Sequence, residues 1–249
     1  MFPIRDHNPS GRTPYVTYAL ILANVGIFLS YWSLFGQPRL LNQFFDTYAL
    51  TPALVSQGGA LGGFATTMCL RGGRTHQAGN MRLLCSFGDN IEDELGHTLY
   101  LAFYIGCGII AGLTHYLSAP LSQIPTVGAS GAIAGVMGGY LLLYPRARVD
   151  IFIFLIVFFR ILPIPAWILL AAWLAMQIYG GIGSAGSDAG VAYWAHAGGF
   201  MAGMLLLVPL WLRRGGSAYW SRTLGHPPHP KARYTTARTR IPHTGRRIS

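Results

Sequence analysis

The chain has 249 residues and a formal net charge of +10, yet only 10% of its residues are charged and 52% are hydrophobic. Soluble domains carry about 25% charged residues, so this composition excludes a charge-solvated globule. The apolar content also excludes a disordered chain, and the 32 glycines lack the three-residue period of collagen. The class that remains is an all-α, multi-pass membrane protein.

The first expected element is a polar N-terminal segment, residues 1–13, without the compact pattern and cleavage site of a signal peptide. An uncharged apolar run over residues 15–35 follows, and it is long enough to cross a bilayer. The next loop, residues 36–63, contains or adjoins Trp, Phe and Tyr residues. Such aromatic segments are typical of chain that lies in the membrane interface.

Residues 64–87 leave the number of spans open. They begin with apolar FATTMCL, but three arginines follow, Arg71, Arg74 and Arg82. Each of them would cost about 2.5–3.5 kcal/mol at mid-membrane. Hydropathy alone therefore rejects this segment. The chain would then cross the membrane five times, with its two ends on opposite sides.

Four further apolar runs predict spans over residues 97–117, 127–144, 165–179 and 191–212. The stretch IFIFLIVFFRIL, residues 151–162, is short for a span and is followed by prolines. We expect it to be an interfacial or partly buried connector before the fifth helix. Cys69, Cys85 and Cys107 are scattered without a CxxC pair, so we expect neither a disulfide framework nor a metal site.

The basic residues decide between five spans and six. Arg5 and Arg12 precede the first span, Arg146 and Arg148 lie between the fourth and fifth, and a basic segment follows the last. Six crossings put all three groups on one side, as the positive-inside rule requires. We therefore expect six spans over residues 14–212, with both termini cytoplasmic, in the plasma (cell inner) membrane.

The last segment, residues 213–249, contains nine Lys or Arg and no Asp or Glu. This composition predicts a disordered basic tail. After a membrane domain such a tail more commonly lies near anionic lipid, so we expect lipid rather than nucleic acid as its partner.

Ser130 lies among small residues in the fourth span. Gly131, Gly135 and Gly139 recur every four positions and form one smooth helix face, and this spacing lets another helix approach closely. Taken alone, Ser130 is either a nucleophile or one more small packing residue.

His196 lies in the sixth span, with Gly199 and Gly203 on the same helix face. An ionisable residue within a span is a functional candidate, although a histidine satisfied inside the bundle is the alternative. If the two glycine-lined faces pack together, His196 and Ser130 come within hydrogen-bond reach, about 2.6–3.2 Å, and the histidine can act as general base. No acid lies within a confident span, which favours a dyad over a triad.

His76 and Asn80 are four residues apart, so they share one face if residues 64–87 are helical. Both side chains can donate hydrogen bonds to a developing oxyanion, and the backbone N–H of Ser130 is a further donor. The alternative is that both are polar loop residues in a segment that never enters the membrane.

These pieces together resemble the rhomboid family of intramembrane serine proteases. The matching motifs are GASG around Ser130, AHAGGFMAG around His196, HQAGN from His76 to Asn80, and the turn FGDNIEDELGH, in an order that fits the family over about residues 14–212. The resemblance implies a rhomboid-type six-helix bundle that hydrolyses peptide bonds in or near the transmembrane segments of other membrane proteins.

The same resemblance implies roles for single residues. Ser130 becomes the nucleophile, His196 the base, and His76 and Asn80 the oxyanion donors, with no metal or cofactor. It also implies that the loop after the first span lies partly in the outer leaflet, and that Glu92 is a structural residue in the acidic turn.

The chain departs from the family pattern in its second and fourth helices. Arg71 stands where members commonly have a second histidine, and Arg74 and Arg82 stand where the second helix is usually apolar. We expect Arg71 and Arg74 to extend to the outer surface. Ala134 occupies the position of a tyrosine that stacks on the catalytic histidine in some members.

Two alternative functions remain beside the protease. One is a catalytically inactive rhomboid-like protein that binds membrane clients, and the intact Ser130 and His196 argue against it. The other is a transporter or channel with His76 and His196 in its path. That reading predicts paired repeats or broken helices in both halves, and the sequence contains no such repeat.

Overall fold

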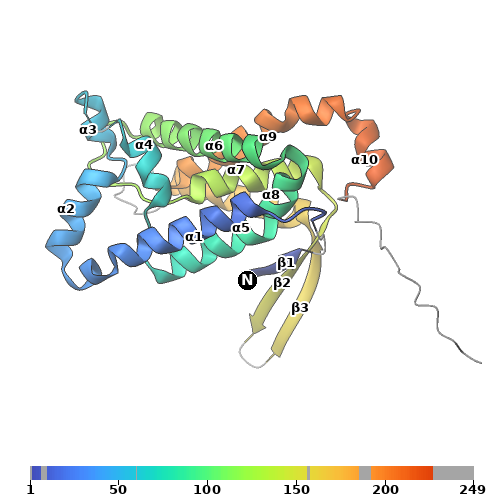
Figure 1. The fold of residues 1–249 in the computed structure, drawn as a ribbon, viewed down its shortest axis with the longest axis horizontal. Coiled ribbons are helices and arrows are strands. Elements are labelled where there is room, and N and C mark those ends of the chain that lie inside the picture. Colours follow the sequence, from blue (N-terminus) through green and yellow to red (C-terminus); the bar gives the residue numbers. More distant parts are fainter. Residues whose placement is uncertain (1, 7–9, 60, 156–157, 185–191, 227–249) are drawn as a thin grey trace, which may run out of the picture.

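The computed structural model describes residues 2–6, 10–59, 61–155, 158–184 and 192–226 (Figure 1). Within them, six helices of 14 residues or more lie side by side: α1 (Tyr15–Ser30), α5 (Arg74–Leu95), α6 (His97–Ser118), α7 (Ser130–Leu143), α8 (Ala166–Gly183) and α9 (Tyr193–Arg213). Of these, α6, α8 and α9 are long and apolar enough to cross a membrane, and α1 and α7 are apolar but shorter. The expectation of a mostly helical protein with several apolar candidate spans is confirmed.

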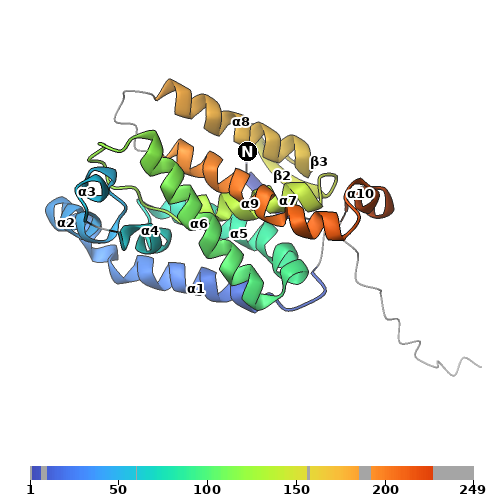
Figure 2. The same cartoon turned by 90° about the horizontal axis from the view of Figure 1, so that it is seen from above.

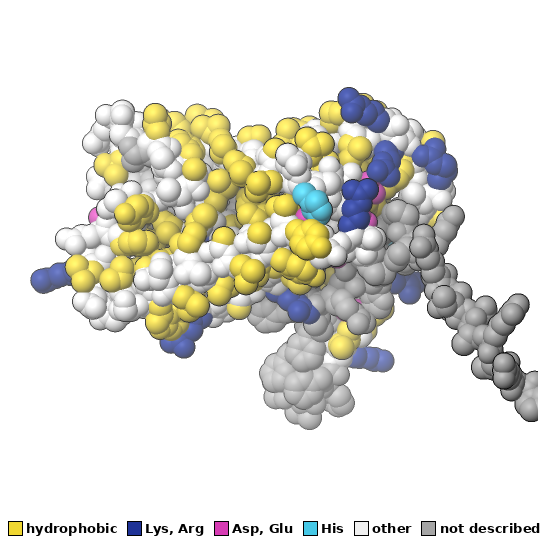
Figure 3. Space-filling model, in the orientation of Figure 1, with side chains coloured by type: hydrophobic (Ala, Val, Ile, Leu, Met, Phe, Trp, Pro, Cys, Tyr) yellow, Lys and Arg dark blue, Asp and Glu magenta, His cyan; other side chains and the backbone are white. Residues whose placement is uncertain are grey.

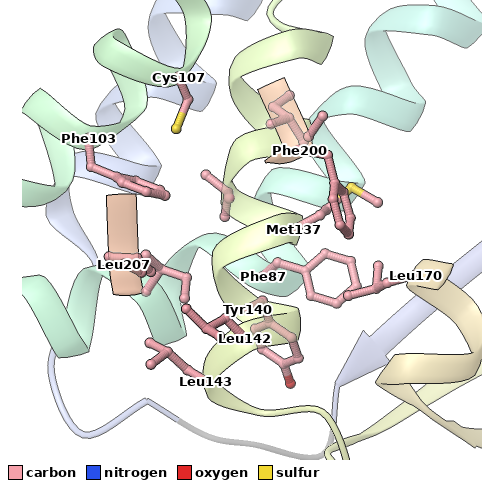
Figure 4. Packing of buried hydrophobic residues seen from close by; sticks show 14 of the residues in the cluster. Phe87, Phe103, Cys107, Met137, Tyr140, Leu142, Leu143, Leu170, Phe200 and Leu207 are labelled. Carbon is pink, nitrogen blue, oxygen red and sulfur yellow. The ribbon is translucent and has the colours of Figure 1, made fainter. Parts of the chain in front are cut away.

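Helix α7 lies at the centre of the bundle. Twelve of its 14 residues are buried, and α1 and α8 lie at opposite outer edges (Figure 2). Around α7 the core joins side chains of α5, α8 and α9, with the ring of Phe87 4.9 Å from that of Tyr140 and with Leu170 and Phe200 beside them (Figure 4). Because α7 is central, its first residue, Ser130, can be approached by side chains of the surrounding helices.

The predicted glycine faces of α7 and α9 do meet. A Cβ atom added at Gly199 would lie 2.0 Å from the carbonyl oxygen of Gly131, and one at Gly203 would lie 1.8 Å from that of Gly135. Backbone therefore lies against backbone along this interface, where no side chain fits.

The second helix begins later than the sequence predicts. Residues 64–69 form two short elements, α4 (Gly63–Thr66) and η2 (Thr67–Cys69), and α5 starts only at Arg74. The acidic stretch expected to be a turn is instead the last part of α5, and the turn is Gly96, whose φ is +73°. Gly72 and Gly73 precede the helix, which explains the late start, because glycine disfavours helix continuation.

The chain between α1 and α5 forms a cap of short helices at one end of the bundle: η1 (Trp32–Gly36), α2 (Pro38–Tyr48), α3 (Pro52–Ser56), α4 and η2. Aromatic contacts hold it together, with the ring of Tyr31 4.8 Å from that of Phe44 and 5.7 Å from that of Phe28. The expected aromatic loop is therefore a packed structure with its own small core.

The expected connector over residues 151–162 is a β-hairpin. Strands β2 (Arg148–Leu155) and β3 (Phe158–Pro165) pair antiparallel, and β1 (Phe2–Asp6) pairs with β2 to complete a three-stranded sheet in the order β1-β2-β3. Isoleucine and phenylalanine favour strands, and the prolines of β3 lie on an edge strand. The sheet joins the N-terminus to the α7–α8 connection.

The prediction of a disordered tail from residue 213 is wrong at its start, because α10 (Ser217–Thr223) is helical. Its aromatic residues pack on the bundle: Tyr219 is buried, and Trp220 Nε1 donates a hydrogen bond to the carbonyl of Leu142 at 2.9 Å. This burial fixes a segment that its charge alone would leave in solvent. The rest of the expected tail, residues 227–249, lies outside the described residues.

The surface agrees with a membrane setting. Hydrophobic side chains cover much of the middle of the bundle, whereas many of the visible Lys and Arg side chains gather at the end that carries α10 (Figure 3). Exposed apolar residues include Leu22, Ile109 and Tyr179, on three different helices. An apolar surface of this extent on a bundle is typical of lipid-facing helices.

Candidate active site

Ser130 is the first residue of α7, where a helix has backbone N–H groups without partners in its own first turn. The preceding loop is held on both sides. Leu50 and Thr126 form a β-bridge, and Gly128 N donates to the carbonyl of Thr67 at 2.9 Å. Gly128 has φ +141°, a backbone conformation that residues other than glycine rarely adopt. These contacts fix the loop that leads into Ser130.

His196 reaches Ser130 from α9. Its Nε2 atom lies 2.7 Å from Ser130 Oγ, a hydrogen-bond distance. The glycine contact between α7 and α9 makes this possible, because short Ser and His side chains meet only when the two backbones are close. A neutral imidazole in this position can accept the hydroxyl proton.

Two residues of α8 contact the rest of the His196 imidazole. Its Nδ1 atom lies 2.7 Å from Gln177 Oε1, and its ring centroid lies 5.8 Å from that of Trp173. Sequence reasoning identified neither residue. The available signal was one glutamine in an otherwise apolar span, four residues after a tryptophan.

His76 lies beside Ser130, and Asn80 lies deeper in α5. A Cβ atom added at Gly128 would be 3.0 Å from Ser130 Oγ and 3.3 Å from His76 Cε1, so both side chains border the same small space. Asn80 is buried and donates its Nδ2 to the backbone carbonyl of His76 at 2.9 Å. The structure thus brings Ser130, His196 and His76 together, while the Asn80 amide bonds to its own helix.

Arg71 contradicts the expectation that it extends to the outer surface. It is fully buried, its guanidinium donates to the carbonyls of Met68 and Leu70, and Nη2 donates to Asn24 Oδ1 at 2.8 Å. Tyr31 completes the contact by accepting the backbone N–H of Arg71 at 2.7 Å. The carbonyl acceptors explain how a cation is tolerated here.

The other two arginines have exposed side chains. Arg74, the first residue of α5, is exposed, and its guanidinium lies 4.6 Å from the indole centroid of Trp32 in the cap of short helices. Arg82 is exposed on the outer side of α5.

Glu92 lies at the opposite end of α5. Its carboxylate accepts hydrogen bonds from the backbone N–H groups of Val16 and Thr17, both at 2.8 Å, and from Thr17 Oγ1 at 2.7 Å. It also lies 2.6 Å from His97 Nδ1. A carboxylate on the first N–H groups of α1 is favourable, because they are unpaired within the helix and carry partial positive charge. The contact ties α1 to α5, in line with the structural role that the family resemblance implies.

Among the residues that the structure describes, no three His, Cys, Asp or Glu side chains form a group that could hold a metal ion. The candidate site itself contains a hydroxyl, a base that can accept its proton, and N–H donors beside them. This set can perform acyl transfer through a serine ester.

The chain is similar in sequence to known proteins. A family model described as the rhomboid domain matches residues 58–213. Rhomboid protein 1, mitochondrial, of Saccharomyces cerevisiae is 32% identical over 136 residues, which cover 52% of this chain and 36% of that protein. The putative rhomboid protease YdcA of Bacillus subtilis is 40% identical over 76 residues, 30% of this chain and 38% of that protein.

A third relative is the mouse presenilin-associated rhomboid-like protein, mitochondrial, which is 38% identical over 85 residues, 33% of this chain and 22% of that protein. The matched part of the chain thus spans between 22% and 38% of the length of these curated relatives.

Proposed function

This chain belongs to the rhomboid family, and from that premise we propose that it is an intramembrane serine endopeptidase that cleaves transmembrane segments of other membrane proteins. The observation that carries the proposal is the 2.7 Å contact between Ser130 Oγ and His196 Nε2. An inactive, client-binding relative has no need of such a pair.

In the proposed reaction, Ser130 Oγ attacks the carbonyl carbon of the scissile peptide while His196 Nε2 takes its proton. The oxyanion accepts hydrogen bonds from the Ser130 amide and His76. Asn80 Nδ2 carries two hydrogens, and the His76 carbonyl uses one, so the second is available as a further donor. His196 then gives its proton to the leaving amine, and water hydrolyses the serine ester.

The substrate follows from the same chemistry. Peptide bonds in an intact helix are hydrogen-bonded and sterically hidden, so the cleaved segment must unwind locally. We therefore expect Gly, Pro or small residues near the cut, because they destabilise a helix.

The direct test is reconstitution in liposomes with a model transmembrane substrate that contains a Gly-Pro helix break. We expect cleavage, and we expect a fluorophosphonate probe to modify Ser130, as mapped by mass spectrometry. A matched substrate in which leucines replace the break should be cleaved more slowly. Binding of the substrate without cleavage or probe labelling would instead identify an inactive client-binding protein.

We further propose six membrane crossings over residues 14–212, with both termini in the cytoplasm. The ends of the helices support this topology. Arg12 Nε lies 3.7 Å from Asp93 near the end of α5, and Arg214 after α9 contacts the neighbouring Glu94. The backbone N–H of Arg146, after α7, donates to the carbonyl of Gly225 at 3.0 Å. These basic residues therefore lie at one end of the bundle, as the positive-inside rule requires.

The site lies toward the other end. Ser130, His196 and His76 all lie in the first turns of their helices. Helix α7 has 14 residues and is about 21 Å long, whereas the hydrocarbon core is about 30 Å thick. If its last residue reaches the cytoplasmic boundary, Ser130 lies below the outer surface, where water must enter from the non-cytoplasmic side.

The proposed topology predicts the location of two reporters. A reporter fused after Ser249 should be cytoplasmic, and one inserted at residues 120–125, between α6 and α7, should be external. A cysteine-accessibility assay in intact cells distinguishes the two sides. An external signal after Ser249 would contradict six crossings.

Replacing Gly128 with alanine should lower the rate of cleavage by about 100-fold. The added Cβ would lie 3.0 Å from Ser130 Oγ and 3.3 Å from the His76 ring, and φ is +141° there. It would therefore occupy the space proposed for the oxyanion, and loss of one oxyanion donor costs about 10²–10³ in rate.

Gly72→Ala is the matched control, because its Cβ would make only an ordinary 3.7 Å contact with Val127. Cleavage rates of purified variants against the same substrate check the prediction. Equal rates for the two variants would remove Gly128 from the proposed oxyanion site.

A further inference from the structure

Helix α8 contacts the proposed general base through two residues one turn apart, Trp173 and Gln177. We propose that Gln177 is a positioning residue for His196, so that the site works as a Ser130–His196–Gln177 triad in which an amide takes the place of the usual carboxylate. This inference rests on the proposed peptidase function and adds to it a third residue from a third helix.

The first argument concerns the histidine tautomer. A neutral imidazole carries one N–H, so Nε2 can accept the proton of Ser130 only if the hydrogen sits on Nδ1. Nδ1–H then needs an acceptor, and Gln177 Oε1 lies 2.7 Å away. The amide oxygen selects the tautomer that can serve as base, and it fixes the direction of the ring.

The second argument concerns the transition state. When His196 takes the proton of Ser130 it becomes a cation, and its hydrogen bond to Gln177 becomes charge-assisted. Such bonds are about twice as strong as neutral ones. An interaction that strengthens in the transition state raises the rate of the chemical step rather than the affinity for substrate. Loss of the acceptor should therefore lower kcat and leave KM nearly unchanged.

The surroundings of Gln177 support this role. The residue is buried on α8, an apolar helix whose other side faces outward. A buried amide is costly unless it is hydrogen-bonded, and the bond to His196 supplies that partner. Trp173 lies against the imidazole, tilted by 38° to it, and also packs on Phe200.

The three acids near the end of α5 have other hydrogen-bond partners. Glu92, Asp93 and Glu94 are bonded at the far end of α5, to Thr17, to Gly11 and to Tyr144 respectively. Asp188 lies outside the described residues. His196 Nδ1 instead contacts Gln177 Oε1.

The test compares wild type with Gln177→Leu, which keeps the bulk and removes the acceptor, in the reconstituted cleavage assay. We expect kcat to fall by about 10- to 100-fold, KM to stay within about twofold, and the unfolding temperature to remain unchanged or to rise. Met176→Leu is the control, because Met176 is adjacent on α8 and 61% exposed. It should behave as wild type. Should Gln177→Leu fail to fold, Gln177→Met removes the same oxygen with an unbranched side chain.

A double variant separates positioning from packing. In a His196→Ala background, Gln177→Leu should cause no further loss of the residual cleavage, because the residue acts only through the histidine. A kcat within twofold of wild type in the single variant, or an equal loss with and without His196, would overturn the inference and leave the dyad standing. A wild-type protein that neither cleaves nor reacts with the probe would overturn the proposed function and this inference together.

Discussion

Replacement of Ser130 by alanine is expected to lower cleavage of a reconstituted transmembrane substrate by at least about 10⁴-fold, or about 5.5 kcal/mol of activation free energy. The variant keeps the α7 helix and loses only the Oγ atom that lies 2.7 Å from His196 Nε2. Without that oxygen no serine ester forms, and the oxyanion donors alone leave a small residual rate. Cleavage over long incubation, quantified by product mass, measures the effect.

Ser118→Ala is the matched control for this loss. Ser118 ends α6, is exposed, and donates its hydroxyl to the carbonyl of His115 at 2.7 Å. Its removal should leave cleavage within about twofold of wild type. The Ser130→Ala/His196→Ala double variant should be no less active than Ser130→Ala alone, since the two act as a unit. Undiminished cleavage by Ser130→Ala would sink the assignment of the nucleophile.

Gly203→Ala is expected to destabilise the folded protein by about 3 kcal/mol and to lower its unfolding temperature by about 6–12 °C. The new Cβ would lie 1.8 Å from the carbonyl oxygen of Gly135. Because this oxygen belongs to the backbone, a change of side-chain rotamer cannot relieve the clash. Helices α7 and α9 would have to separate, and Ser130 and His196 would separate with them. Thermal unfolding in detergent, followed by circular dichroism, checks the stability.

Gly106→Ala on α6 is the control, because a Cβ there meets nothing within 4 Å. Alanine favours helix over glycine by about 1 kcal/mol, so this variant should be slightly stabilised. Equal stability of the Gly203→Ala and wild-type proteins would contradict the close α7–α9 packing, because it would show that a methyl group fits at this position.

The sequence predicted the parts of the site that depend on local spacing. Glycines every four residues form a face on any helix, so the small-residue faces around Ser130 and His196 follow from helix geometry alone, and the two faces do meet. The apolar runs predicted the helices in the same way, with most ends displaced by a few residues. The start of α5 was wrong by ten residues, since Gly72 and Gly73 interrupt a run that hydropathy treats as continuous.

Other features depended on contacts between distant residues. The burial of Arg71 requires the Asn24 amide and carbonyls that only the folded cap assembles. Likewise α10 is held by the packing of Tyr219 and Trp220 on the bundle, which no local pattern of a basic segment shows.

The sequence by itself therefore determined the class of protein, the helical framework, and the residues with the chemistry for acyl transfer. The tertiary structure alone decided which atoms face each other: His196 Nδ1 toward Gln177, 19 residues away on another helix, and the Asn80 amide toward its own backbone. The physical reason is that spacing along one helix is fixed by its 3.6-residue turn. The pairing of side chains across helices depends on how whole helices pack, and in this protein the close α7–α9 contact brings a serine and a histidine together.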